Sequence, residues 1–200
     1  MKIIGLTGPT GSGKSLLCDY LSEHGIPVID ADEVYHGLLV PPSPCLYALR
    51  RVFGDGILQA NGTLNRGALS DIVFNDKEKL SLLNDTVLGF VLDRIREMID
   101  DLARRGHSAV VVDAPTLIES GFHLECDTVV SILSPADLRI QRIKARDGLT
   151  DERAHARVAA QKPDEFYVSH SHYVLTNTGD VSEFFKKAKE LSEAISLSLS

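Results

Sequence analysis

The segment from Gly8 to Ser15 has the spacing in this sequence that points most directly to a chemistry. It reads Gly-Pro-Thr-Gly-Ser-Gly-Lys-Ser and fits the pattern G-x-x-x-x-G-K-[ST], called Walker A. In this motif, backbone N–H groups cradle phosphates, the lysine reaches the β- and γ-phosphates and the hydroxyl binds Mg²⁺. The sequence therefore predicts a nucleotide triphosphate site contacted by Gly8, Gly11, Ser12, Gly13, Lys14, Ser15 and Leu16.

The alternative reading of this segment is a glycine-rich turn before an ordinary helix. The flanking residues favour the nucleotide site. Ile3–Leu6 form a short apolar run before the loop, and Leu16, Leu17 and Leu21 follow it at helical spacing. Strand, loop and helix is the order that the motif requires, and the helix adds the positive end of its dipole. Phosphate binding alone does not separate a kinase from an ATPase, a GTPase or a switch protein.

Two acidic positions follow apolar runs. Asp32 lies just past the run that ends at Ile29, where it could accept the proton of an attacking hydroxyl; the alternative is an N-cap for a helix from Glu33 to Leu39. Asp113 follows three valines, the Walker B arrangement that holds Mg²⁺ directly or through water. The alternative for Asp113 is a cap of the next element.

Five arginines have helical spacing. Arg139, Arg142 and Arg146 share one predicted helix face at i, i+3 and i+7, and Arg153 and Arg157 are spaced i, i+4 on the next candidate helix. Arginine donates in a planar fork and stays charged, which suits phosphates. The functional reading is a mobile lid that closes over the transferring phosphoryl group. The alternative is a solvated helix face.

The elements that must position these residues alternate along the chain. Five apolar runs are predicted as strands: Ile3–Leu6, Pro27–Ile29, Ala109–Val112, Thr128–Leu133 and Tyr173–Leu175. Helical patterns between them predict an α/β fold with a parallel sheet covered on both faces. Long helices are expected from Asp76 to Arg105, ended by Gly106, and from Ser182 to Ile195, capped by Asp180 or Ser182.

The composition limits the classes of partner and compartment. The chain has 200 residues and a net charge of −7, which argues against a general nucleic-acid or anionic-membrane surface. Three scattered cysteines indicate neither a disulfide framework nor a zinc site, so a reduced, cytoplasmic setting is expected. No apolar run has the length of a membrane span, and a first strand beginning at Lys2 leaves no room for a signal peptide.

An ordered set of motifs along nearly the whole chain resembles the dephospho-coenzyme A kinase family. It comprises Leu6 to Ser15, Asp30-Ala31-Asp32, Gly62 to Arg66, Leu69, Val73-Phe74, Leu83-Asn84, Asp113 to Glu119, Gln141-Arg142, Arg146 to Leu149, Arg157 to Gln161, Asn177 and Gly179. The loop motif alone is common to many families, whereas the ordered set is specific.

The resemblance implies a single three-layer P-loop kinase domain over residues 1–200 with a parallel five-stranded sheet. The nucleotide-binding core would comprise about 1–30, 107–135 and 170–200, a helical acceptor-binding insert about 31–106, and a small helical lid about 136–165. ATP, with Mg²⁺, would phosphorylate the ribose 3′-hydroxyl of dephospho-CoA; no nucleic acid or membrane partner is implied.

The resemblance also implies residue roles. Asp32 would be the general base at the hydroxyl, and Lys14 and Arg142 would stabilise the moving phosphoryl group. Arg146 and Asn177 would contact ATP, with Asn177 near the adenine. The acceptor region would be lined or supported by Arg66, Asp113 and Gln161, and the metal would be held by Ser15 and, through water, by Asp113.

One pair departs from the family pattern. Leu88-Gly89 stands where the family has His-Pro, and that histidine is thought to help hold the acceptor. Two alternatives therefore stay open: a kinase of the same fold with another acceptor, and a nucleotide-binding regulator that has lost catalysis. The loop string also resembles that of tRNA prenyltransferases, whose chains are longer.

Overall fold

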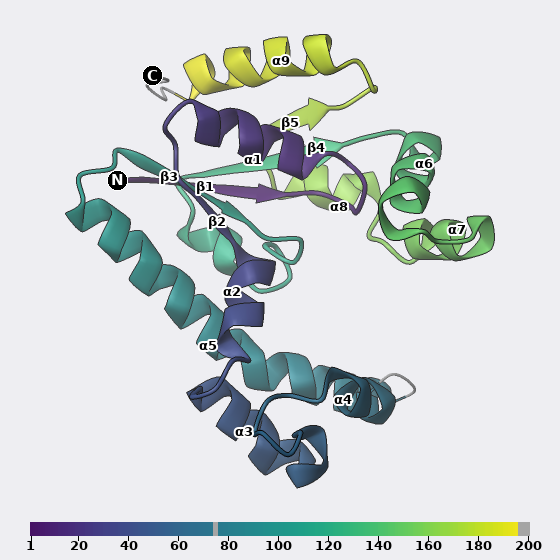
Figure 1. Cartoon of the computed structure of the whole chain (residues 1–200). Helices are drawn as coiled ribbons and strands as arrows, with labels where there is room; N and C mark the ends of the chain where they lie inside the picture. The colour runs from purple at the N-terminus through teal and green to yellow at the C-terminus, as the bar shows by residue number, and fades with distance from the viewer. Residues whose placement is uncertain (74–75, 196–200) are drawn as a thin grey trace. The chain divides into compact units, whose positions relative to one another are not determined.

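The computed structural model describes residues 1–73 and 76–195, which form two compact units. The first unit comprises residues 1–29 and the chain from residue 102 onward, and the second comprises residues 30–101 (Figure 1). Each unit has a hydrophobic cluster of its own.

A parallel sheet forms the centre of the first unit. Its strands are β1 (Lys2–Thr7), β2 (Val28–Asp30), β3 (Ala109–Asp113), β4 (Thr128–Leu133) and β5 (Tyr173–Thr176). The order is β2-β3-β1-β4-β5, with Leu6 of β1 paired to Asp113 and Thr7 to Ser131. The connections diverge to the two sides of β1, so the loop after β1 lies where open α/β sheets bind ligands. The five predicted strands are confirmed.

Helices cover both faces of this sheet. The helices of the first unit are α1 (Lys14–Glu23), η2 (Phe122–Glu125), α6 (Ala136–Asp147), α7 (Asp151–Ala159), α8 (Asp164–Ser169) and α9 (Val181–Ala194). Leu17 of α1 and Phe184 of α9 belong to the cluster on one face. Tyr167 of α8 packs with Leu133 and Ile118, and Figure 1 shows α8 on the other face of the sheet from α1 and α9. The predicted α/β arrangement with a covered parallel sheet is confirmed.

The helices α6 and α7 form a hairpin within the first unit. Gly148 ends α6 in the left-handed conformation, with φ of 64°, and Thr150 caps α7 by accepting from the N–H of Arg153. Ile143 and Ala154 pack in the small core between the two helices. The predicted lid, residues 136–165, contains this hairpin; we use "lid segment" for these residues below.

The second unit is helical, as predicted for the stretch between the second and third strands. It contains α2 (Ala31–Leu38), α3 (Pro44–Phe53), η1 (Asp55–Ile57), α4 (Arg66–Val73) and α5 (Lys77–Arg104), whose last residues belong to the first unit. The bounds of α5 confirm the predicted long helix within two residues, and Gly106 follows it with φ of 85°. None of the helices in the described part of the chain is both long and apolar enough to cross a membrane.

Candidate active site

The loop between β1 and α1 has the backbone conformation that an anion site needs. Gly8, Gly11 and Gly13 have φ values of 138°, 77° and 103°, in the region that side chains with a Cβ rarely adopt. Gly13 lies directly before the first turn of α1, in the left-handed conformation. The loop therefore joins a central strand to a helix N-terminus, where backbone N–H groups and the helix dipole favour negative charge.

Two of these glycines also allow close approach of neighbouring chain. A Cβ built on Gly8 would lie 2.3 Å from the backbone oxygen of Ile132 in β4. A Cβ on Gly13 would lie 2.3 Å from Nδ2 of Asn177. Glycine at these positions is thus required by packing against β4 and by the residue after β5, as well as by backbone angle.

Replacing Gly8 with alanine should destabilise the first unit by about 3 kcal/mol, since it adds a backbone clash to an unfavourable φ. Gly148→Ala is the matched control, because Gly148 also has a positive φ, 64°, but nothing lies within 4 Å of its added Cβ. The control should cost only about 1 kcal/mol. Urea unfolding followed by circular dichroism measures both; equal losses would contradict the steric argument.

Lys14 and Ser15 begin α1 immediately after the loop. The Nζ of Lys14 donates to the carbonyl oxygen of Gly8 at 3.0 Å, so the side chain folds back across the loop rather than extending away from it. Ser15 is exposed, and the N–H of Leu16 is bonded to the oxygen of Gly13 at 3.1 Å within the first turn. The structure therefore brings together the lysine, the hydroxyl and the glycines that the sequence predicted.

Arg142 holds the loop from the lid segment. Its Nη1 donates to the carbonyl oxygens of Gly11 at 3.0 Å and Ser12 at 3.3 Å, and to Oγ of Ser134 at 3.0 Å. Its Nη2 donates to Oδ1 of Asn177 at 3.0 Å. Nδ2 of Asn177, in turn, donates to the Ser12 oxygen at 3.0 Å. In a trans peptide N–H and C=O point in opposite directions, so the Gly13 N–H points away from these side chains.

Arg139 does not lie on a solvated face. It is 5% exposed, and its Nε donates to the carbonyl oxygen of Thr10 at 3.1 Å. Burial lowers the pKa of this guanidinium from its ordinary value. Arg139 and Arg142 thus both bond to loop carbonyls in this structure, and the predicted role of Arg142 at the moving phosphoryl group stays a prediction.

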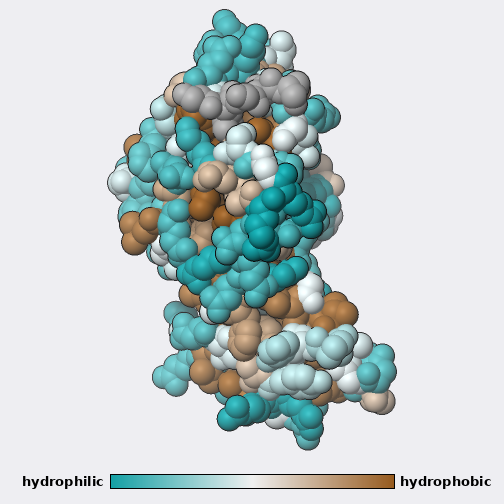
Figure 2. Space-filling view, turned by 90° about the vertical axis from the view of Figure 1, so that its left-hand side faces the viewer, coloured by the Kyte–Doolittle hydropathy of each residue, from teal (hydrophilic) through white to brown (hydrophobic). Residues whose placement is uncertain are grey.

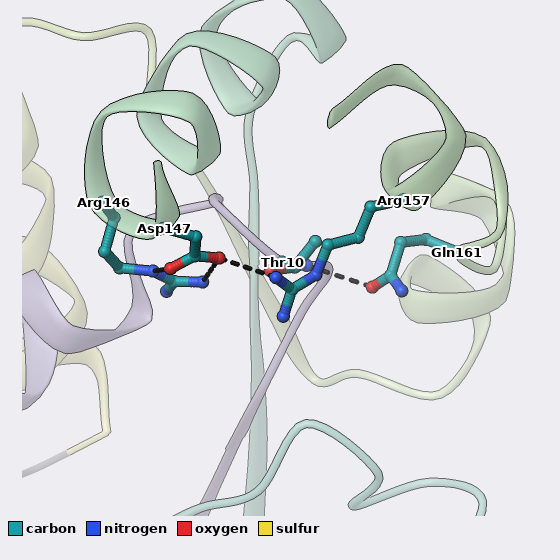
Figure 3. A network of polar contacts seen from close by, with 5 residues as sticks. All are labelled: Thr10, Arg146, Asp147, Arg157 and Gln161. Carbon is teal, nitrogen blue, oxygen red and sulfur yellow. Dashed lines mark hydrogen bonds and ion pairs between the residues drawn. The ribbon is translucent and has the colours of Figure 1, made fainter. Parts of the chain in front are cut away.

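A second polar network joins the lid segment to the loop (Figure 3). The backbone N–H of Thr10 donates to Oε1 of Gln161 at 3.1 Å. Arg146 donates to both carboxylate oxygens of Asp147, at 2.7 and 3.0 Å, and Nη1 of Arg157 donates to Oδ2 at 2.6 Å. Gln161, predicted in the acceptor region, lies in this structure on the phosphate loop.

The oxygen donors near the start of α1 fit a hard cation. Asp113 ends β3 beside Leu6, and its Oδ2 accepts from Sγ of Cys18 at 3.6 Å. Cys18 lies three residues after Ser15, so the exposed Ser15 hydroxyl and the Asp113 carboxylate lie toward the same side of α1. Mg²⁺ prefers one or two such oxygens together with phosphates and water. The described residues contain no cluster of three or more His, Cys, Asp or Glu side chains that could hold a metal.

The thiol of Cys18 is a neutral neighbour of this carboxylate. Its burial, followed by the charge of Asp113, raises the pKa of the thiol above its ordinary value. Cys18 therefore donates its proton toward Asp113 and adds no negative charge beside the predicted metal position.

Asp30, rather than Asp32, caps α2. The Asp30 carboxylate accepts from the backbone N–H groups of Asp32 at 2.8 Å and Glu33 at 3.1 Å, and α2 begins at Ala31. The alternative interpretation of Asp32 as an N-cap is wrong, because the helix starts earlier than Glu33. The Asp32 side chain is exposed and has no hydrogen bond or ion pair to the other described residues of the second unit.

Arg66 lies at a pocket within the second unit. This pocket has a volume of about 250 Å³ and is lined mainly by apolar side chains: Tyr35, Leu39, Leu64, Leu69, Val73 and Leu83, with Arg66 and Ser70. Nη2 of Arg66 donates to Nδ1 of His36 at 3.2 Å. Figure 2 shows hydrophobic surface on this unit, and Val40, Tyr47 and Leu82 are among its exposed apolar residues. The positively charged side chain of Arg66 therefore lies beside the apolar side chains that line the pocket.

The pair Leu88-Gly89 lies in the middle of α5. Leu88 is half-buried and Gly89 is exposed, with nothing within 4 Å of a Cβ added to it. Phe74, which belongs to the motif set, lies outside the described residues. The departure from the family pattern thus concerns two residues of α5 and no residue of the phosphate loop.

Two residues at the site escaped the sequence reasoning. Ser134 and Asp147 contact the predicted arginines; Asp147 lies in the Arg146 to Leu149 motif but was given no role, and Ser134 lies in no motif. The signal for Asp147 was its position directly after Arg146 and ten residues before Arg157. Ser134 offered only its place just after a predicted strand.

Comparisons with known proteins agree along the chain. A sequence model of the dephospho-CoA kinase family matches residues 2–183. A dephospho-CoA kinase from Shouchella clausii is 35% identical over 184 residues, 92% of this chain and 93% of its own length. One from Geobacillus kaustophilus is 37% identical over 180 residues, 90% of each chain.

Solved structures agree with the fold. A dephospho-CoA kinase from Campylobacter jejuni superposes with a TM-score of 0.73 at 26% identity, over 98% of each chain. A shikimate kinase from Acinetobacter baumannii, at 20% identity and a TM-score of 0.59, shares the fold, over 99% of this chain and 96% of its own. The family match spans the phosphate loop, both acidic positions and the arginines of the lid segment, and the chain belongs to the dephospho-CoA kinase family.

Proposed function

We propose that this chain transfers the γ-phosphoryl group of ATP to the ribose 3′-hydroxyl of dephospho-CoA, giving CoA and ADP. The observation that carries the proposal is the phosphate loop itself. Its three positive-φ glycines precede α1, and Lys14 folds across it, in a chain that matches the family over residues 2–183. Phosphoryl transfer needs mainly positioning and charge stabilisation, which this loop is built to supply.

The triphosphate is proposed to lie on the concave side of the loop. The Gly13 N–H, the start of α1 and Lys14 would bind it, while Arg142 and Asn177 keep the loop carbonyls turned outward. Ser15 and Asp113 would hold Mg²⁺, which neutralises phosphate charge when bound. Arg146 and Asn177 remain our proposed contacts to ATP, and Arg142 our proposed contact to the transferring group; for Arg142 and Asn177 this requires that they leave the loop carbonyls to which they donate in this structure.

Asp32 is the proposed base. Its carboxylate would take the proton of the 3′-hydroxyl while that oxygen forms a bond to the γ-phosphorus. The bond from phosphorus to the bridging oxygen breaks, and its electron pair leaves with ADP. Capping of α2 by Asp30 supports this role, because it leaves the Asp32 carboxylate uncommitted to the helix terminus.

The acceptor is proposed to bind the second unit at Arg66. A dephospho-CoA molecule carries a diphosphate between its adenosine and a long amide-containing arm. Arg66 would bind the diphosphate, and the apolar pocket beside it would take part of the arm. The pocket has a volume of about 250 Å³, whereas sites that hold a whole ligand have about 300–1,000 Å³, so it would hold only a part of the molecule. Asp113 and Gln161 are the other residues proposed to line or support the acceptor region.

Arg66→Ala should raise KM for dephospho-CoA about 10- to 100-fold with little change in KM for ATP, because it removes a charge-assisted contact to phosphate. Steady-state kinetics with each substrate varied in turn measures this split. Arg51→Ala is the control: Arg51 is also an exposed arginine of the second unit, in the last turn of α3 and not among the residues lining the pocket. Equal effects on both KM values would contradict the assignment of Arg66 to the acceptor.

The activity itself is tested by mixing the protein with Mg-ATP and dephospho-CoA and following ADP. Turnover that requires dephospho-CoA supports the proposal. ADP release with another small-molecule acceptor but not with dephospho-CoA would favour a different kinase of this fold. Binding of ATP without turnover of any acceptor would favour a regulator.

A cytoplasmic setting with no nucleic-acid or membrane partner is part of the proposal. Cys18, Cys45 and Cys126 are free thiols, and Cys18 and Cys45 are buried. Burial, followed by the negative charges of Glu125 and Asp127, raises the pKa of Cys126 to about 12. The net charge of −7 opposes binding to polyanions in general. Fractionation of the native cell with an antibody to the chain tests the compartment.

A further inference from the structure

Asp147 lies between two arginines of the lid segment. It is the last residue of α6, and its carboxylate accepts two hydrogen bonds from Arg146, at 2.7 and 3.0 Å. Arg157 of α7 donates to the same carboxylate at 2.6 Å. Figure 3 shows the carboxylate between the two guanidinium groups, which therefore converge on one point from two different helices.

The two arginines keep donors for a further anion. Their side chains are 60% and 47% exposed, whereas that of Asp147 is 23% exposed, so the carboxylate lies deeper than the groups it holds. A guanidinium has five N–H donors, and Arg146 spends two on Asp147 while Arg157 spends one. Two positive charges around one negative charge leave a net charge of +1 at this point.

The carboxylate stays ionised in this setting. The hydrogen bond and charge of Arg146, followed by those of Arg157, hold the pKa of Asp147 below its ordinary value. Such charge-assisted, bidentate contacts are shorter and stronger than neutral ones and fix the orientation of the planar guanidinium.

The arginine pair is tied to the phosphate loop. Gln161 lies just beyond the end of α7, four residues after Arg157, and Figure 3 shows both side chains on the same side of this segment. On that side Gln161 accepts from the backbone N–H of Thr10 at 3.1 Å. From α6, Arg142 bonds the loop and precedes Arg146 by one helical turn. Both helices that carry the arginines are therefore anchored on the loop.

We propose that Asp147 is a positioning residue for phosphoryl transfer: it holds Arg146 and Arg157 as a convergent pair whose remaining donors bind the polyphosphate of ATP. The proposal rests on the proposed function for its substrate. Without the carboxylate, two like charges on flexible side chains would repel and separate, and ATP would have to order them on binding at an entropic cost.

The lid segment offers a matched control. Asp151, at the start of α7, pairs with Lys144 of α6 at 2.6 Å and with His155 at 3.3 Å. This pair also links the two helices through an exposed carboxylate, but it involves neither arginine. Asp151→Asn therefore removes a similar link without touching the proposed pair.

The experiment measures turnover and ATP affinity for Asp147→Asn, Asp147→Glu and Asp151→Asn. Asp147→Asn should lower kcat about tenfold and weaken calorimetric Mg-ATP affinity about fivefold, with KM for dephospho-CoA unchanged. Asp147→Glu should recover most of the loss, since it restores the charge. Asp151→Asn should stay within about twofold of the unchanged protein in both readouts.

Repeating Asp147→Asn in a protein that lacks both arginines decides whether Asp147 acts through them. In a background with Arg146→Gln and Arg157→Gln, adding Asp147→Asn should change ATP affinity less than about twofold. Three outcomes would each overturn the proposal. They are an equal loss of ATP affinity when Asp147→Asn is added to that background, no loss of ATP affinity in Asp147→Asn alone, and a loss in Asp151→Asn as large as that in Asp147→Asn. ATP affinity needs no acceptor, so an absence of dephospho-CoA turnover would overturn the proposed function while this comparison still tests Asp147.

Discussion

Lys14→Ala should lower kcat/KM for ATP about 10³-fold and weaken ATP binding at least about tenfold. The Nζ of Lys14 already lies over the loop, 3.0 Å from the Gly8 oxygen, where phosphate charge would be bound. Its ammonium is expected to stabilise charge that grows on the transferring group, and such preorganised electrostatic contacts are among the largest contributions to catalysis. Initial rates at varied ATP, together with calorimetry, measure the two effects.

The control for Lys14 is Lys187→Ala. Lys187 is a lysine of α9 that pairs with Glu183 one turn away and donates to the carbonyl oxygen of Thr176 at 3.4 Å, and it is not among the residues proposed to bind substrate. Its replacement should leave turnover within about twofold, because exposed pairs of this kind contribute little. Normal kinetics in Lys14→Ala, with the fold intact by circular dichroism, would contradict our placement of the phosphates.

Asp32→Asn should reduce kcat about 10²- to 10⁴-fold while ATP affinity changes little, since general-base catalysis contributes on this scale. Asparagine keeps the shape of the side chain and cannot take the proton. The substitution should also leave α2 intact, because the cap of that helix is supplied by Asp30. Rapid-quench measurement of CoA formation, with ATP binding measured in parallel, gives both quantities.

Glu33→Gln provides the comparison for Asp32. Glu33 is exposed, lies in the same first turn of α2 and also loses one negative charge in this variant. It should retain turnover within about twofold. If Asp32→Asn turned over as fast as Glu33→Gln, Asp32 would have no part in proton transfer.

Local pattern was sufficient for the sheet, the long helices and the phosphate loop. The five strands have alternating or continuous apolar runs, and α5 has its apolar side chains at three- and four-residue spacing, so each element is set by residues close together in sequence. The loop was predictable because its glycines set the conformation of the loop itself and Lys14 bonds to a carbonyl within the same segment. The helical nature of the insert, about residues 31–106, was implied by the family resemblance.

Positions near element ends were harder to predict. Asp30 and Asp32 are both plausible caps by residue type, and the choice depends on where β2 ends and α2 begins. At the other end of the chain, two candidates were open for α9, and Asp180 takes the cap by accepting from the N–H of Glu183 at 3.0 Å. For α2, a shift of two residues decides which carboxylate caps the helix and which is left for chemistry.

The sequence alone determined that this protein has a phosphate loop on a parallel α/β sheet, because strand, loop and helix are adjacent in the chain and their geometry follows from local residue types. Only the tertiary structure decided how the predicted arginines are used. Arg142 meets Asn177 across 35 residues, and the Thr10 N–H meets Gln161 across 151. Such contacts depend on where the chain returns in space, which helical spacing does not specify. The contacts of Arg142 and Asn177 with the loop carbonyls, and those of Asp147 with Arg146 and Arg157, were therefore visible only in the fold.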